Sequence, residues 1–346
     1  MTLEITRPRP AGGTGASTPA EPREGRAPAA TRARAGARAR DPRLGYQLAA
    51  LNAVISGFAV YLNSLGVKMF ADSTLYTALK NGVVALVVVL PFLVSAARRQ
   101  DLARLTRREW GLLVLIALVA GSLAYGLDFR GRQISTATTA AVIGHAEFLI
   151  VALAAAVFLR ERFPRTVPAA LLVLTAGLAL GLRVHDVRLD AGVLWLAAGT
   201  LLFAAGAVLI KVALRTVPVA AVVGVKMVLG AALLFAYVAA TGGLASIVRL
   251  STVQWGFVLV TGLILLAFTV TAIGGLHHAS ATGVTAVSAG APVVTAALVA
   301  TTRRVPLHPA QLLSLGLVLT GVFAVYVAGV AEERRAAARR GLTRAR

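Results

Sequence analysis

The sequence has no cysteine, little charge and few aromatic residues. Of its 346 residues, 14% are charged and 6% aromatic, whereas 58% are hydrophobic. Without cysteine, neither disulfide bonds nor thiolate metal sites can form, and the sequence does not indicate whether the protein lies in an oxidising or a reducing compartment. Ordinary soluble domains carry about 25% charged residues, so this composition excludes that class. The sequence therefore predicts an integral membrane protein.

The formal net charge of +21 raises the question of nucleic-acid binding. However, the arginines lie in the two ends of the chain and between apolar runs, and not on one amphipathic face, which argues against it. Residues 1–42 are rich in Arg, Ala, Pro and Gly and are predicted to be disordered. They do not resemble a signal peptide. Residues 331–346 form a second basic tail.

Apolar runs of roughly 20 residues recur along the rest of the chain, which is the length that crosses a membrane core of about 30 Å as a helix. We therefore expect an all-α membrane protein with ten transmembrane helices. The expected spans are 46–68, 73–96, 109–128, 135–159, 166–183, 190–212, 218–240, 253–275, 280–301 and 309–330.

The distribution of Lys and Arg predicts the orientation of these spans. If the N-terminus is cytoplasmic, 25 of the 35 basic residues lie on the inner side and 8 on the outer side, Arg130 and Arg132 among the latter. The remaining two, Lys80 and Lys226, lie within spans. Because cytoplasmic loops carry the excess of positive charge, both termini are predicted to be cytoplasmic.

The two halves of the chain, 43–185 and 186–330, resemble each other at a nearly constant offset. Five matches occur in order at offsets of 143 to 146 residues: Trp110-Gly111 with Trp255-Gly256, Leu172–Thr175 with Leu317–Thr320, Lys68 with Lys211, Lys80 with Lys226, and Ala137-Thr138 with Ala281-Thr282. Each half holds five expected helices. Because five is odd, the second copy enters the membrane inverted, and inverted repeats are the usual basis of alternating access.

The fourth expected span of each half carries a family resemblance. The first copy reads ISTATTAAVIGHAEFLIVALAAAVFLRERF, and the chain resembles the EamA-type members of the drug/metabolite transporter superfamily. Glu147 falls on the family's first Glu, with Phe148 where Pro is usual. Glu161 falls on the terminal Glu, with Arg160 in place of Gly.

The second copy, ASATGVTAVSAGAPVVTAALVATTRRV, keeps the proline as Pro292. Ala291 replaces the first Glu, and Val305 stands where the terminal Glu would be. The resemblance covers about residues 46–330. It implies ten helices in two inverted five-helix repeats, and secondary transport, often export, of amino acids, metabolites or drugs across the cytoplasmic membrane. A coupled proton or counter-substrate is a further implied partner; no cofactor is implied.

Ionisable residues inside spans cost about 2.5–3.5 kcal/mol each on insertion scales, so the few present are candidate site residues. Lys80 and Lys226 lie about 11–12 Å deep at 1.5 Å per residue, counted from opposite faces. We expect them to line one central cavity and to favour an anionic group, unless Glu147 neutralises one of them. Glu147 either takes a proton, binds a solute ammonium, or forms an ion pair with Lys80.

The other polar candidates are expected to be structural. Glu161 and Arg160 are expected in an ion-pair cluster, with gating as the alternative. His145 points roughly 200° away from Glu147 on an ideal helix. His277 and His278 are expected to be solvated loop residues, and no metal site is expected.

Two other function classes remain beside a transporter. One is a membrane scaffold or accessory subunit that transports nothing. The other is an intramembrane enzyme, but the sequence has no cysteine, His-rich metal motif or G-x-S-x-G motif to support it.

Overall fold

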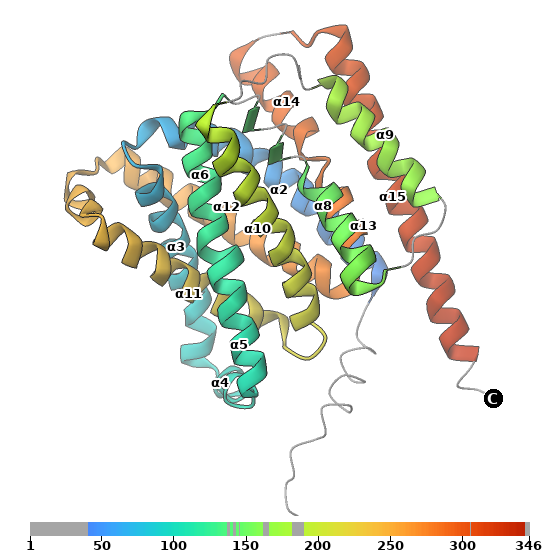
Figure 1. Ribbon diagram of the computed structural model, residues 1–346, viewed down its shortest axis with the longest axis horizontal. Coiled ribbons are helices and arrows are strands. Elements are labelled where there is room, and N and C mark those ends of the chain that lie inside the picture. Colours follow the sequence, from blue (N-terminus) through green and yellow to red (C-terminus); the bar gives the residue numbers. More distant parts are fainter. Residues whose placement is uncertain are drawn as a thin grey trace, which may run out of the picture.

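The computed structural model describes residues 41–136, 139–140, 143–144, 146–161, 166–181, 190–304 and 306–342, and these residues form a bundle of helices (Figure 1). Of the tail predicted to be disordered, 1–42, only residues 41 and 42 are among the described residues. His145 also lies outside the described residues. The helices are α2 (Pro42–Met69), α3 (Ser73–Val94), α4 (Ala96–Ala103), α5 (Arg107–Ile116), η1 (Ala117–Leu123), α6 (Ala124–Ile134), α8 (Glu147–Ala154), η2 (Ala155–Leu159), α9 (Thr166–Gly181), α10 (Ala191–Ala213), α11 (Val219–Ala240), η4 (Gly243–Arg249), α12 (Thr252–His278), α13 (Ala281–Ser288), α14 (Ala291–Arg303) and α15 (Pro309–Leu342).

Eight helical stretches in the described part of the chain are long and apolar enough to cross a membrane. In one of them, α5, η1 and α6 run together from Arg107 to Ile134, and in another α13 and α14 are taken together. Two shorter apolar helices, Glu147–Leu159 and Thr166–Gly181, lie where the fourth and fifth spans are expected. The chain is thus an all-helical, multi-pass membrane protein, and the count of ten spans stays a prediction.

Two helices run further than the sequence analysis expects. The third span reaches Ile134 and not 128, because Asp128 and Arg132 are four residues apart and pair on one helix face. The last helix, α15, continues to Leu342 past the expected end at residue 330. Its extension is composed mostly of Ala, Glu and Arg, which are strong helix formers.

Capping boxes start the third helix of each half at repeat-related positions. Thr106 and Glu109 cap α5, and Ser251 and Gln254 cap α12, 145 residues later. In each box the hydroxyl oxygen accepts from the backbone N–H three residues on, while the longer side chain accepts from the backbone N–H of the first residue. The internal repeat is therefore visible in local hydrogen bonding as well as in sequence.

The fourth helix of the second half is broken, whereas the sequence analysis expects it to be continuous. α13 ends at Ser288, and α14 begins at Ala291 with Pro292 in its first turn. Proline has no N–H to continue the helical ladder and fits the first turn of a new helix. In the first half, Glu147 is likewise the first residue of a helix, α8, with Ala146 as its N-cap residue.

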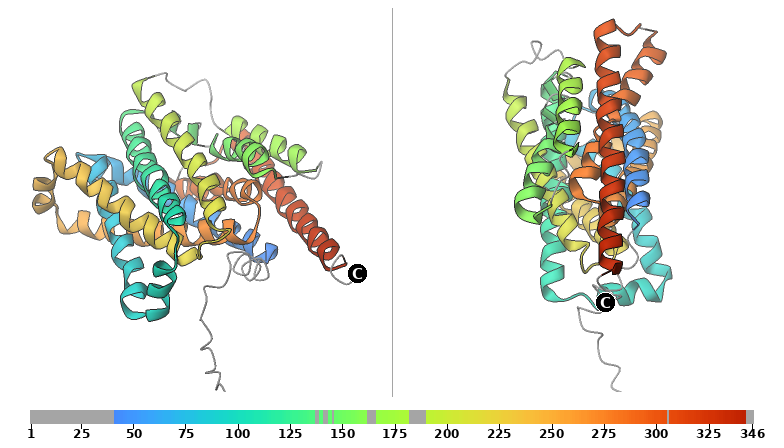
Figure 2. Two further views of the ribbon diagram at one scale, coloured as in Figure 1. Left: turned by 60° about the horizontal axis from the view of Figure 1, so that its bottom comes forward. Right: turned by 90° about the vertical axis from the view of Figure 1, so that its right-hand side faces the viewer.

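The strongest helix contacts join one half of the chain to the other (Figures 1 and 2). α2 packs on α12 and α10 packs on α6, so the first helix of each half lies against the third helix of the other. α3 packs on α11, and α9 packs on α15, which pairs second with second and fifth with fifth. This is the contact pattern of two related halves around a pseudo-twofold axis.

Glycines bring the lysine-bearing helices close to the opposite half. A Cβ added at Gly121 in η1 would lie 2.7 Å from the carbonyl oxygen of Lys226. A Cβ added at Gly262 in α12 would lie 3.2 Å from the carbonyl oxygen of Lys80 and 2.8 Å from Val83. Because only glycine leaves room for such approaches, both lysines lie on backbone that is tightly held from across the repeat boundary.

Candidate functional site

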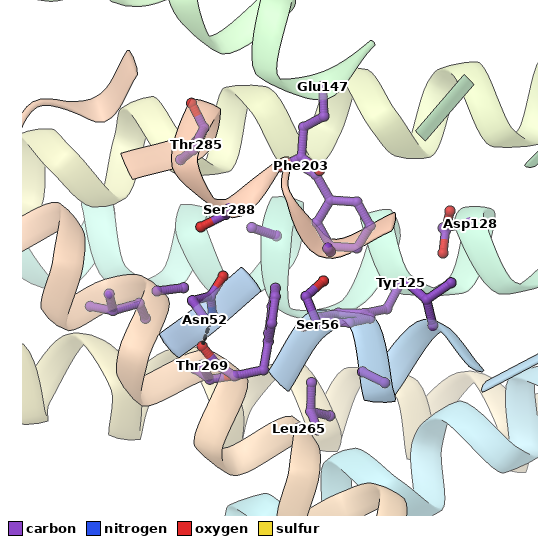
Figure 3. Close-up of a pocket in the computed structure, with 18 of the residues that line it drawn as sticks. Asn52, Ser56, Tyr125, Asp128, Glu147, Phe203, Leu265, Thr269, Thr285 and Ser288 are labelled. Atoms are coloured by element: carbon purple, nitrogen blue, oxygen red, sulfur yellow. Dashed lines mark hydrogen bonds between the residues drawn. The ribbon is translucent and has the colours of Figure 1, made fainter. Parts of the chain in front are cut away.

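A cavity of about 310 Å³ lies between the two halves of the bundle, with walls from α2, α3, η1, α6, α8, α10, α11, α12, α13 and α14 (Figure 3). Its size suits a small organic molecule. All five charged side chains on its wall, among the residues described, come from spans that are otherwise apolar: Lys80, Asp128, Arg132, Glu147 and Lys226.

Lys80 is held by several groups at once. Its ammonium donates a hydrogen bond to Asn63 Oδ1 at 3.2 Å and lies 3.6 Å from the ring centroid of Phe129. The Tyr76 hydroxyl donates to the same Asn63 oxygen at 2.9 Å. The side chain is 1% exposed. In the described residues no salt bridge joins Lys80 to Glu147, which was one expected role for Glu147.

Lys226 is also buried but has poorer partners. Its ammonium is 3.7 Å from the sulfur of Met227, which is a weak acceptor. It is 5.3 Å from the ring centroid of Tyr125, so the cation–π contact is a distant one. Within the described part of the chain, no oxygen atom accepts a hydrogen bond from Lys226. The two lysines thus lie on one cavity wall but in different surroundings.

Asp128 and Arg132 are cavity residues that the sequence analysis missed. The Arg132 guanidinium donates from Nε to Asp128 Oδ2 at 2.7 Å, which makes a salt bridge along one face of α6. Asp128 is buried. Arg132 was assigned to an outer loop because polar residues end the apolar run near 128, but it lines the cavity. A spacing of four between opposite charges was the available signal.

Glu147 lies at a helix break and not in mid-helix. It is the first residue of α8, half-buried, and its side chain borders the cavity. Ala291, its counterpart 144 residues later, is the first residue of α14 and also borders the cavity. In the described residues Glu147 forms no salt bridge. Paired helix breaks at a central site are a recurrent design of secondary transporters, because free backbone groups there can face a solute.

The remaining wall is mainly apolar, with polar groups on α2 that the sequence analysis also missed. Tyr125 packs edge-on against Phe203, with ring centroids 4.9 Å apart (Figure 3). Asn52 donates to the Phe268 carbonyl at 2.9 Å and to Thr271 Oγ1 at 3.0 Å, which ties α2 to α12. Single Asn residues inside apolar runs were a usable signal, because polar side chains in a membrane are costly unless they have a partner or a role.

Glu161 lies at one end of the bundle, beyond η2. Its carboxylate accepts hydrogen bonds from the backbone N–H groups of Ala281 at 2.8 Å and Thr282 at 3.3 Å. These are the first residues of α13, where a negative charge is favourable. Arg160 has a φ of 53°, a left-handed conformation that turns the chain after η2. No salt bridge joins Glu161 to Arg160 in the described part of the chain.

Lys211 on α10 contacts the junction between the end of α12 and the start of α13. Its ammonium donates to the carbonyl oxygens of Leu276, at 2.6 Å, and Ala279, at the end of α12. The start of α2 meets this end of the bundle as well, since the Asp41 N–H donates to His278 Nδ1 at 3.1 Å. Lys68, the repeat-related partner of Lys211, is exposed. The α12–α13 junction is therefore tied to the first half by Glu161 and to α10 by Lys211.

His277 and His278 occupy the last turn of α12 and are half-buried, where solvated loop residues were expected. Their rings meet edge to face with centroids 4.9 Å apart. Among the described residues, no cluster of three or more His, Cys, Asp or Glu side chains could hold a metal ion.

Comparison with known proteins bears on the fold and the class. The model of the EamA-like transporter family matches the sequence twice, over residues 43–183 and 190–327. No curated protein matches the sequence significantly. One solved structure, described only as "Crystal structure of protein", matches with a TM-score of 0.61 and 20% identity over 83% of this chain and 98% of its own. That likeness shows the fold alone.

Proposed function

Because this chain belongs to the EamA-like transporter family, whose members are membrane transporters and not enzymes, we propose that it exports a small organic solute across the cytoplasmic membrane. The proposed mechanism is alternating access by ten spans in two inverted repeats, with both termini in the cytoplasm. The excess of Lys and Arg on one side supports this orientation.

One observation carries the proposal: a single cavity receives side chains from both halves of the chain and contains both central lysines. A site at the interface of inverted repeats can be exposed to either side when the halves exchange conformations. The cross-repeat helix pairs and the helix breaks at Glu147 and Ala291 support this arrangement.

The charged side chains on the cavity wall determine which charge on a solute is favoured. Three cationic and two acidic side chains leave one formal positive charge when all are ionised. We therefore propose that Lys80, Lys226 and Glu147 contribute to solute binding and that the solute carries an anionic group. Glu147, which forms no salt bridge among the described residues, is proposed to take a coupled proton or to meet a cationic group of the solute or a counter-substrate.

Glu161 is proposed to act in gating and not only in structure. Its two hydrogen bonds to α13, together with those of Lys211 to the end of α12, hold the cytoplasmic end of the bundle together. A solute can enter the cavity from that side only after these contacts separate. The left-handed Arg160 places Glu161 for this contact.

The proposal is tested by comparing metabolites inside and outside cells that produce the wild type or the Glu147→Gln variant at equal membrane levels. The Gln side chain keeps the shape but removes the charge. We expect a solute that the wild type depletes from the cells to remain inside cells with the variant. Identical distributions for the wild type, the variant and cells without the protein would refute transport of a small solute.

A further inference from the structure

We infer that the anionic group of the solute binds at Lys226, that Lys80 mainly holds the cavity wall, and that the solute is a small singly charged organic acid with an apolar body. This inference rests on the proposed transport function and assigns its solute class. Sequence symmetry makes the two lysines equivalent, whereas their contacts make them unequal.

The three cationic side chains of the cavity differ in the partners that stabilise their positive charge. Arg132 is paired with Asp128 at 2.7 Å. Lys80 has Asn63 as an oxygen acceptor and the face of Phe129 at 3.6 Å. Lys226 has the Met227 sulfur at 3.7 Å and the distant Tyr125 ring at 5.3 Å, and no oxygen acceptor among the described residues. Lys226 is 6% exposed and its ammonium has no oxygen acceptor among the described residues, so its burial carries a desolvation cost that an incoming anion would relieve.

The surroundings of Lys226 also offer hydroxyl groups to an anion. Thr269 donates to the same Met227 sulfur at 3.9 Å, so its hydroxyl shares a weak acceptor and can turn to a better one. Tyr125, the aromatic neighbour of Lys226, borders the cavity too. The lysine backbone itself is fixed by the close approach of Gly121. An ammonium carried on a closely held backbone, with two hydroxyl-bearing side chains on the same cavity wall, is a suitable site for a carboxylate.

The rest of the wall limits the body of the solute. One cation without an oxygen partner matches one negative charge, so a dianion would leave a charge unmet in apolar surroundings. Phe203, Phe268 and Leu265 contribute apolar surface within a volume of about 310 Å³. The geometry thus points to a monocarboxylate with an aromatic or branched aliphatic body.

The inference is tested by thermal unfolding of the purified full-length protein in detergent, followed by tryptophan fluorescence. Without added solute, Lys226→Met is expected to unfold at the wild-type temperature or above it, because a poorly matched buried charge is removed. Lys80→Met is expected to unfold at a lower temperature, because it loses the Asn63 bond and the Phe129 contact. Lys68→Met, at an exposed position, is the control.

The probes are phenylacetate and its neutral isostere phenylacetamide, with 4-phenylbutyrate as a longer acid. We expect the acids, but not the amide, to stabilise the wild type. The apparent affinity for the acids should fall about 30-fold or more in Lys226→Met, less in Lys80→Met, and should partly return in Lys226→Arg.

Three of the binding results would overturn the inference: equal stabilisation by acid and amide, an acid response that survives in Lys226→Met, or no response of the wild type to either acid. A lower unfolding temperature for Lys226→Met than for Lys80→Met would also overturn it. In each case a Glu147-dependent change in metabolite distribution would leave the transport function standing, so the two failures can be told apart.

Discussion

The contact between Glu161 and the start of α13 predicts a measurable shift between the two states of the transporter. Replacing Glu161 by Ala removes two hydrogen bonds from a carboxylate to backbone N–H groups, at 2.8 and 3.3 Å. Hydrogen bonds to charged groups contribute about 1.5–3 kcal/mol each when well formed. Because the second bond is long and water replaces part of the loss, we take about 2 kcal/mol in total.

A free-energy change of about 2 kcal/mol corresponds to roughly a 30-fold change in an equilibrium constant. If the Glu161 contact exists only while the cytoplasmic end is closed, Glu161→Ala should move the population by that factor toward the state open to the cytoplasm. Glu161→Gln keeps one acceptor oxygen without the charge and should give an intermediate shift.

The absence of cysteine makes this shift easy to observe, because a single introduced cysteine is the only thiol in the chain. Ser56→Cys places the thiol on the cavity wall. In intact cells, a membrane-impermeant maleimide should label this cysteine more slowly when Glu161 is Ala, because the cavity opens to the outside less often. Labelling from the cytoplasmic side of inverted vesicles should become faster.

Glu109→Ala is the matched control. Glu109 also accepts backbone and hydroxyl hydrogen bonds at a helix start, at 2.8 and 2.9 Å, but they come from Thr106 of its own capping box. Its loss should leave labelling of Ser56→Cys close to that of the parent. If Glu161→Ala labels from both sides at the rates of the Glu109→Ala control, Glu161 does not hold the cytoplasmic end closed.

Two further predictions concern topology and packing. Single cysteines at positions 40 and 340 should be protected from an impermeant reagent in intact cells, and labelling of either from outside would contradict the cytoplasmic placement of that terminus. Gly121→Ala should destabilise the protein by about 1–3 kcal/mol, because its new Cβ would lie 2.7 Å from the Lys226 carbonyl oxygen. Gly111→Ala, which meets nothing within 4 Å inside α5, should be neutral or stabilising by up to about 1 kcal/mol in the same unfolding assay, and an equal loss of stability in both variants would show that the close approach is unimportant.

Features that repeat along the chain were accessible from sequence. Apolar runs located the starts of the long helices to within several residues, since membrane thickness sets the length of an apolar span, but they missed the polar extension of α15. The depth of Lys80 and Lys226 in a membrane, counted at 1.5 Å per residue from opposite faces, stays a prediction. Both lysines lie on the wall of one cavity, and their roles in binding stay predictions.

Features that depend on contacts between distant segments were not accessible. In the sequence, Asp128 and Arg132 look like the polar end of a span, because a hydropathy count treats each charge as exposed to water. In the structure the two charges pair with each other on α6. The helix start at Glu147 was missed, since Phe148 stands where a proline would mark it. The partner of Glu161, the backbone N–H of Ala281 on α13, lies 120 residues away in the sequence, and no local sequence pattern predicts this contact.

The packing of each half against the other has a consequence for how the protein is made. The main partner faces of α2, α3, α6 and α9 belong to α12, α11, α10 and α15, which are synthesised later. The starts of these partner helices are 67 to 210 residues apart, which at about 5–20 residues per second corresponds to roughly 3 to 42 s of synthesis. During this delay Lys80 and the Asp128–Arg132 pair have their first-half partners but lack the helices of the second half that later pack against them. The two halves made as separate chains are therefore expected to form these helix pairs only when both are present in the same membrane.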